Sequence, residues 1–152
     1  MNKISWDETF MNLAKVYAAR SKDQSSQIGA VIIGPNNEQR AGGYNGMPRG
    51  INDDVPERHI RPAKYEWLEH AERNAIFNAA RIGTAVDGCK MYVSGMTPCT
   101  NCARAIIQSG IRSVIVETFD VPERWKENMR IALEMLKEAG VQVTTVIPGK
   151  KT

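Results

Sequence analysis

The chain has 152 residues, of which 42% are hydrophobic and 24% are charged. This length and composition fit one domain with a single core and exclude a disordered or fibrous chain. The net charge of +3 is scattered along the chain, which suits phosphorylated ligands and argues against a duplex-binding protein. Without an apolar run of about 20 residues or a secretory leader, we expect a cytoplasmic protein of a bacterium or a phage-infected host, with no membrane or polynucleotide partner.

Hydrophobic periodicity and turn residues predict alternating helices and strands. Helices are expected over residues 5–20, 70–81, 99–108 and 122–139. Strands are expected over residues 27–34, 39–44, 90–94, 113–116 and 141–147. The turn at 34–37 makes the first two strands an antiparallel hairpin, and helices separate the later strands as in parallel crossovers. We therefore expect a three-layer α/β/α fold with a five-stranded mixed sheet.

Residues 46–65 form a polar stretch interrupted by three prolines and by Gly50, and we predict a long irregular segment there. Irregular segments of this length are uncommon inside compact domains and are usually functional.

The last predicted helix carries two apolar lines. The first line is Trp125, Met129, Ala132, Leu136 and Ala139, and the second is Ile131 and Met135. Such a helix packs on a neighbouring subunit as well as on its own sheet, or else both lines are covered by the core of the chain. The sequence leaves both alternatives open.

The cysteines and histidines carry the main chemical signal. His70 precedes Glu72 by two residues, and Cys99 and Cys102 follow Pro98 at the predicted start of a helix. One imidazole and two thiolates leave the fourth position of a tetrahedral Zn²⁺ open, as in catalytic sites. His-x-Glu followed by Pro-Cys-x-x-Cys is the signature of zinc-dependent nucleobase deaminases.

The spacing of these residues constrains their geometry. Cys99 and Cys102 are one helical turn apart and share a helix face. His70 and Glu72 differ by about 200° around an ideal helix, so they converge only over its opening turn. We therefore predict that two helix N-termini meet at the metal. Zinc lowers the pKa of water toward about 7, and Glu72, which stays off the metal, is the candidate catalytic group that moves the proton.

Alternative uses of the cysteines are a structural zinc site or a redox pair. A structural site needs a fourth protein ligand, for which Cys89, His59 and carboxylates remain. A thioredoxin-like pair would follow the first strand of its βαβ unit, whereas this pair lies about two-thirds along the chain. We predict a single zinc ion, a buried Cys89 and a His59 in a loop, where phosphate or subunit contacts are its alternative role.

Several segments, the two zinc motifs among them, carry a further likeness. They are Ser21–Asp23, Gln27–Ile32, Gly43–Gly50, Asp53–Asp54, His70–Ile76 and Thr97–Ala103. Together they resemble the deoxycytidylate (dCMP) deaminase family of the cytidine deaminase-like superfamily, and the Gly-Tyr-Asn-Gly-Met-Pro segment points to the dCMP branch. The resemblance implies one zinc-dependent domain over residues 1–152 that hydrolyses dCMP to dUMP and ammonia and supplies dUMP for thymidylate synthesis.

The same resemblance implies where ligands bind. Asn45 would contact the deoxyribose, and the backbone near Ala71, Thr97 and Pro98 would read the cytosine. Family members are often homohexamers that dCTP activates and dTTP inhibits, with the triphosphate and a Mg²⁺ near the Gly-Tyr-Asn-Gly loop. The candidate effector-binding residues are Lys22, Gly43, Tyr44, Gly46, Arg49, Asn52 and Asp53.

The sequence does not decide which residue binds the substrate phosphate. Family members often have an aromatic and a basic residue after the strand that ends near residue 116, whereas residues 117–120 of this chain include no basic side chain. Arg112, Arg124 or a neighbouring subunit are the candidates. The alternative functions are a cytidine or deoxycytidine deaminase, a tRNA or DNA base deaminase, and a noncatalytic zinc or nucleotide-binding module.

Overall fold

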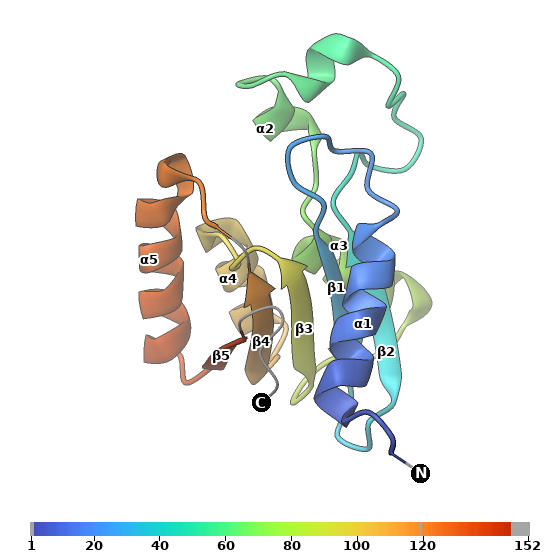
Figure 1. Cartoon of the computed structure of the whole chain (residues 1–152), viewed down its shortest axis with the longest axis vertical. Coiled ribbons are helices and arrows are strands. Elements are labelled where there is room, and N and C mark those ends of the chain that lie inside the picture. Colours follow the sequence, from blue (N-terminus) through green and yellow to red (C-terminus); the bar gives the residue numbers. More distant parts are fainter. Residues whose placement is uncertain (1, 119, 147–152) are drawn as a thin grey trace.

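The computed structural model describes residues 2–118 and 120–146, which form a sheet with helices on both faces (Figure 1). The strands are β1 (Gly29–Ile33), β2 (Gln39–Tyr44), β3 (Lys90–Gly95), β4 (Ser113–Thr118) and β5 (Gln142–Val146). The helices are α1 (Trp6–Ala18), η1 (Pro56–His59), α2 (Lys64–Trp67), α3 (Ala71–Ile82), α4 (Thr100–Gln108) and α5 (Glu123–Glu138). The expected three-layer α/β/α fold is confirmed. Residue 147, the expected end of the last strand, and residue 119 lie outside the described residues.

The sheet is mixed, with the strand order β2-β1-β3-β4-β5. β1 is antiparallel to both β2 and β3, whereas β3, β4 and β5 are parallel to one another. The carboxyl ends of β2 and β3 therefore lie at the same edge of the sheet as the beginning of β1. This edge is the upper one in Figure 1.

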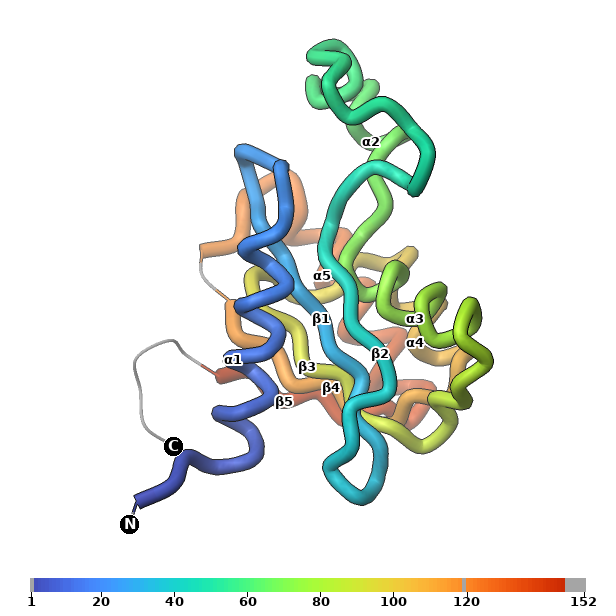
Figure 2. Tube along the Cα trace, turned by 90° about the vertical axis from the view of Figure 1, so that its right-hand side faces the viewer, coloured from blue at the N-terminus to red at the C-terminus, as the bar shows by residue number. Residues whose placement is uncertain are grey.

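Helix α1 covers one face of the sheet, and α3, α4 and α5 cover the other (Figure 2). Phe10, Met11 and Ala14 of α1 pack with Tyr92 of β3, whose hydroxyl also donates a hydrogen bond to Asp7. The larger core lies on the opposite face and includes buried apolar side chains of α3, α4 and α5.

The two predicted apolar lines of α5 differ in burial. Met129, Ala132 and Leu136 of the first line are buried. On the second line, Met135 packs against the larger core, whereas Ile131 is 40% exposed. The core of this chain therefore covers the first line from Met129 to Leu136 and only half of the second.

Strand β2 approaches α3 closely at Gly43. A Cβ atom placed there would lie 2.6 Å from the backbone nitrogen of Ala75 and 2.9 Å from the carbonyl oxygen of Ala71. Real Cβ atoms do not come this near to backbone, so the contact requires glycine. This approach brings β2 against the first turns of α3.

Substituting Gly43 tests this packing. We expect Gly43→Ala to lower the free energy of unfolding by about 1–3 kcal/mol because β2 must separate from α3. The matched control is Gly46→Ala, whose added Cβ would meet the Tyr44 ring at an ordinary 3.7 Å. Urea unfolding curves measure both variants, and equal midpoints would contradict the close contact.

Residues 46–69, called the 46–69 segment below, project beyond the sheet (Figures 1 and 2). The prediction of a wholly irregular stretch at 46–65 was wrong in part, since η1 and the start of α2 lie within it. Both helices are four residues long, which is too short to give a recognisable periodicity. Backbone hydrogen bonds of 3.0 and 2.9 Å between Gly46 and Glu69 close the base of the segment.

Candidate active site

Two helix N-termini meet at the upper edge of the sheet, as the spacing predicts. His70 is the N-cap residue of α3 and Cys99 is the N-cap residue of α4, both in extended backbone conformations. Cys102 is the third residue of α4. Because His70 lies just outside its helix, its side chain is free of the 200° separation from Glu72 that a helix interior would impose.

The three predicted metal ligands converge. The Nδ1 atom of His70 lies 3.3 Å from the Sγ atoms of both Cys99 and Cys102, and all three atoms lie within 4.8 Å of one another. Tetrahedral zinc, with bonds of about 2.0 Å to nitrogen and 2.3 Å to sulfur, places such atoms about 3.5 Å apart. The donor set and its size therefore fit a zinc ion with three protein ligands. No other such cluster occurs within residues 2–118 and 120–146.

The electrostatics of this cluster favour a thiolate. Hydrogen bonds from Cys102 and His70 lower the pKa of Cys99 to about 4. The contact with Cys99 also raises the pKa of His70 to about 9 and raises the pKa of Cys102. A metal ion must displace protons from His70 and Cys102, so metal affinity is expected to rise with pH.

Glu72, the second residue of α3, is only 4% exposed. Burial raises the pKa of its carboxyl group, with attraction to His70 acting in the opposite direction. A carboxyl group held in this way can accept a proton and return it near neutral pH.

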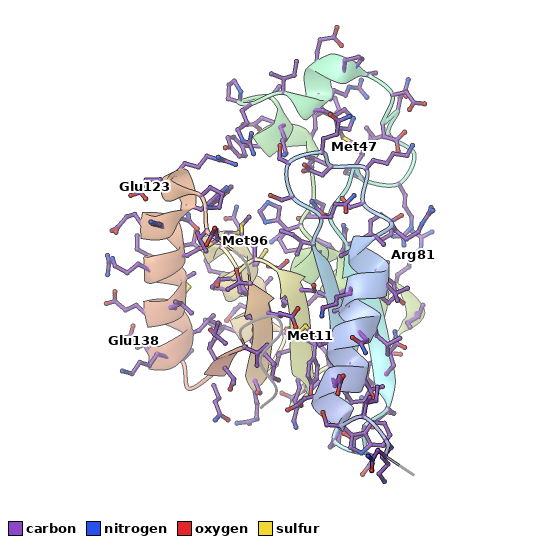
Figure 3. All side chains as sticks on the ribbon, in the orientation of Figure 1. Met11, Met47, Arg81, Met96, Glu123 and Glu138 are labelled. Atoms are coloured by element: carbon purple, nitrogen blue, oxygen red, sulfur yellow. The ribbon has the colours of Figure 1, made fainter. Side chains whose placement is uncertain are left out.

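A pocket opens beside these residues, between the sheet edge and the 46–69 segment. Its lining includes the predicted residues Glu72, His70, Cys99 and Asn45, but not Cys102, together with side chains from other parts of the chain. The lining residues are Asp23, Ser26, Ile28, Asn45, Arg61, Lys64, Tyr65, Leu68, His70, Glu72, Met96, Thr97, Cys99 and Trp125. Figure 3 labels Met96, which follows β3 at this edge.

Only two of the four expected substrate-binding residues line the pocket. Asn45 and Thr97 line the pocket. Ala71 and Pro98 are fully buried next to Glu72 and Cys99 and do not contribute to the lining. Asn45 is fixed by the protein, since its Oδ1 accepts a hydrogen bond from the Ile28 backbone at 2.9 Å.

Sequence reasoning missed the basic residues of the pocket, Arg61 and Lys64. The signal that could have found them was the prediction that the long irregular stretch containing both residues is functional. Arg112 was a wrong candidate for this chain's own pocket, because it precedes β4 and therefore lies at the opposite edge of the sheet. Arg124 is exposed in the first turn of α5, next to Trp125 of the lining.

The candidate effector residues divide into two groups. Gly43, Tyr44, Gly46 and Arg49 line a groove along β2 and α3, which Arg40, Arg81, Asn74 and Asn78 also line. Figure 3 labels Arg81 on that side. Lys22 and Asp53 instead form an ion pair of 3.0 Å beside a separate hollow, and Asn52 caps the turn at Asp54. The structure does not bring the two groups together in this chain.

The remaining cysteine and the remaining histidine of the chain lie away from the cluster. Cys89 is buried in the larger core, as predicted. His59 lies in η1, within the 46–69 segment, with its Nε2 2.6 Å from the carbonyl oxygen of Asp53.

Comparison with known proteins agrees with this geometry. The sequence profile described as the cytidine and deoxycytidylate deaminase zinc-binding region matches residues 4–118. The chain belongs to this family. The matched range includes all three predicted metal ligands and Glu72.

Two relatives illustrate the extent of the likeness. The deoxycytidylate deaminase of Homo sapiens is 47% identical over 117 residues, which are 74% of this chain and 64% of that protein. The chain thus spans less than two-thirds of the human family member. An uncharacterized deaminase encoded in the luxG 3′ region of Aliivibrio fischeri is 41% identical over 143 residues, covering 91% of this chain and 92% of that protein.

The fold is shared with a solved structure. The dCMP deaminase of the cyanophage S-TIM5, crystallised with dCMP and dUMP, superposes with a TM-score of 0.78 at 23% identity. The superposition covers 96% of this chain and 100% of that one. The cytidine deaminase-like fold is therefore confirmed. Among the described residues, no helix is long and apolar enough to span a bilayer.

Proposed function

We propose that residues 1–152 act as one zinc-dependent domain that hydrolyses dCMP to dUMP and ammonia. The observation that carries the proposal is the triangle of His70, Cys99 and Cys102, of which His70 and Cys99 line one pocket with the buried Glu72. Family membership and the names of the relatives favour dCMP over other substrates.

His70, Cys99 and Cys102 would hold the zinc ion, which supplies Lewis-acid activation of water near neutral pH. Glu72 accepts a proton from the attacking water and delivers it to the ring nitrogen N3 as oxygen adds to C4 of cytosine. It then carries the second proton to the amino group, which leaves as ammonia. The proton count balances because water supplies both protons.

The remaining pocket residues would orient the nucleotide. Asn45 is assigned to the deoxyribose, and the backbone around Ala71, Thr97 and Pro98 to the cytosine edge. The Trp125 ring stands edge-on to His70 at a centroid distance of 6.4 Å and to Tyr65 at 5.9 Å. These rings give the pocket an apolar side that limits the access of water to the reacting base.

Arg61 is our candidate for the 5′-phosphate. Asp23 neutralises Lys64, whereas Arg61 has no carboxylate partner among the described residues and lies 6.0 Å from the centroid of the Tyr65 ring. Its planar guanidinium suits bidentate binding of phosphate oxygens.

Removing the Arg61 charge should weaken the binding of dCMP and leave the binding of the nucleoside deoxycytidine unchanged. We expect Arg61→Gln to raise KM for dCMP by about 10-fold to 100-fold, since a hydrogen bond to a charged group is lost. Deoxycytidine, which lacks the phosphate, should be turned over as by the wild type. Arg58→Gln is the matched control from the same segment, because Arg58 stacks on Trp67 and does not line the pocket. An equal loss on both substrates would contradict the assignment.

We further propose activation by dCTP and inhibition by dTTP, each with Mg²⁺, in a cytoplasmic homohexamer. Support comes from the resemblance and from the groove along β2 and α3, where Arg49 and Arg81 offer positive charge, whereas Glu38 pairs with Arg40 at 2.8 Å. The second group, Lys22, Asn52 and Asp53, would take part only through another subunit or another ligand.

Ammonia release tests the function directly. The substrates are dCMP, deoxycytidine, dAMP and a single-stranded oligonucleotide, each with and without dCTP or dTTP plus Mg²⁺. We expect turnover to be highest on dCMP. Absence of dCMP turnover under every effector condition would overturn the proposal, and preferred turnover of the oligonucleotide would indicate a nucleic-acid deaminase.

A further inference from the structure

The 46–69 segment supplies one wall of the pocket, although almost none of it is buried. Arg61, Lys64, Tyr65 and Leu68 contribute to the lining. Between residues 46 and 69, all of which the structure describes, Lys64 is the one buried residue, at 9% exposure. A segment with so little buried apolar surface has little hydrophobic stabilisation of its position. Its place over the pocket therefore depends on polar contacts in addition to the edge-on contact of Tyr65 with Trp125.

Three ion pairs join this segment to the loop that precedes β1, and the longest of them joins Lys22 to Asp54 at 3.9 Å. Lys22 pairs with Asp53 at 3.0 Å, but both side chains are substantially exposed, and such pairs contribute little. Lys64 pairs with both carboxylate oxygens of Asp23, at 2.8 and 3.0 Å, and both residues are buried. The Asp23–Lys64 ion pair is the stronger candidate for fixing the segment, because water does not screen it.

Asp23 also organises the residues around Asn45. Its carboxylate accepts hydrogen bonds from the backbone nitrogens of Ser25, at 2.8 Å, and Ser26, at 3.1 Å. The carbonyl oxygen of Ser26 in turn accepts a hydrogen bond of 2.8 Å from Nδ2 of Asn45. The turn that receives Lys64 is thus the turn that orients the proposed sugar-binding amide.

We propose that the Asp23–Lys64 ion pair is a positioning contact that holds the pocket wall and Asn45 in place for the nucleotide. The inference rests on the proposed function, since its effect appears in the binding of dCMP. Asp23 and Lys64 act through other residues, so the expected effect is on KM more than on kcat. Removing one partner leaves an uncompensated charge in a buried position, which displaces the segment or admits water.

The test compares single and double variants in the full chain. We expect Lys64→Met and Asp23→Asn each to raise KM for dCMP by about 10-fold to 100-fold, the size of effect that misplacement of binding groups produces. The double variant Asp23→Asn/Lys64→Met removes both charges and should be no worse than the poorer single variant, because the two residues act as one unit. Lys64→Arg, which keeps the charge, should recover part of the loss.

Lys126→Met is the matched control. Lys126 pairs with Glu123 at the same 2.8 Å, but both residues are exposed and neither lines the pocket. The KM of Lys126→Met for dCMP should equal that of the wild type. Thermal unfolding of every variant shows whether it is folded, and the double variant keeps the test valid if a single buried charge prevents folding.

Deoxycytidine separates positioning from direct contact with the phosphate. A positioning role predicts that kcat/KM falls on deoxycytidine as well as on dCMP, with the larger fall on dCMP because the same segment carries Arg61. A loss confined to dCMP, or a lower unfolding temperature with an unchanged KM, would overturn the inference while leaving the proposed function intact. A wild-type chain inactive on every substrate would overturn the proposed function and the inference with it.

Discussion

Replacing Glu72 by glutamine should leave the zinc site intact and abolish efficient turnover. Glutamine has nearly the same shape but cannot accept and return a proton, so kcat should fall by about 10²–10⁴-fold, the usual contribution of general acid–base catalysis. Zinc content and the dissociation constant for dUMP should stay close to wild type, because Glu72 is not among the three clustered metal ligands. Metal analysis, dUMP titration and ammonia release measure the three quantities.

A control carboxylate makes this result specific. Glu66 lies in α2, is exposed and does not line the pocket, so Glu66→Gln should retain full kcat. Wild-type turnover by Glu72→Gln would show that another group moves the proton. Loss of zinc from the same variant would show that Glu72 supports the metal rather than the proton transfer.

The second large effect is expected on removing a metal ligand. Cys102 is fully buried, with its sulfur 3.3 Å from Nδ1 of His70, and Cys102→Ala removes one of three ligands. We expect the purified variant to lose its zinc and its activity and to unfold at a lower temperature, because the free energy of metal binding contributes to folding. Elemental analysis and thermal unfolding with and without added zinc provide the measurements.

Cys89→Ala is the matched control for that variant. Cys89 is equally buried but lies in the core, away from the cluster. It should keep zinc and activity and lose about 1 kcal/mol of stability, as is common for a small core substitution. Retention of zinc by Cys102→Ala, or its loss from Cys89→Ala, would contradict the ligand assignment.

The metal cluster could be predicted from the sequence because its geometry follows from local spacing. A three-residue interval fixes the two cysteines relative to each other, and the His-x-Glu pair makes sense only at a helix start. The helix containing Cys102 was expected to begin at residue 99, and it begins at Thr100, with Cys99 as its N-cap. That difference of one residue places the Cys99 side chain at the open end of the helix.

The other side of the pocket could not be predicted in this way. Arg61, Lys64 and Tyr65 reach it because tertiary contacts fold the 46–69 segment over the sheet edge, and no local period reports such contacts. The helical spacing places Trp125 on the first apolar line of the last helix and does not predict a place in the pocket. Trp125 lies in the first turn of α5, and its ring faces Tyr65 and His70 across the pocket.

The resemblance grouped Lys22 and Arg49 as effector contacts, and the structure separates them. Arg49 lies on the side of α3, where it donates a hydrogen bond of 2.7 Å to Asn78. The 46–69 segment then carries Asp53 back over the loop before β1, where it meets Lys22. Residues that are close in sequence thus face different hollows, because the segment reverses between them.

The close contact at Gly43 links the position of β2 to that of the first turn of α3. The backbone of Gly43 rests against the carbonyl of Ala71, and Ala71 joins the proposed ligand His70 to the proposed proton carrier Glu72. A shift of β2 toward α3 would press on that peptide, and a shift away would remove its support. We therefore expect a displacement of β2 to be transmitted to the turn that carries His70 and Glu72.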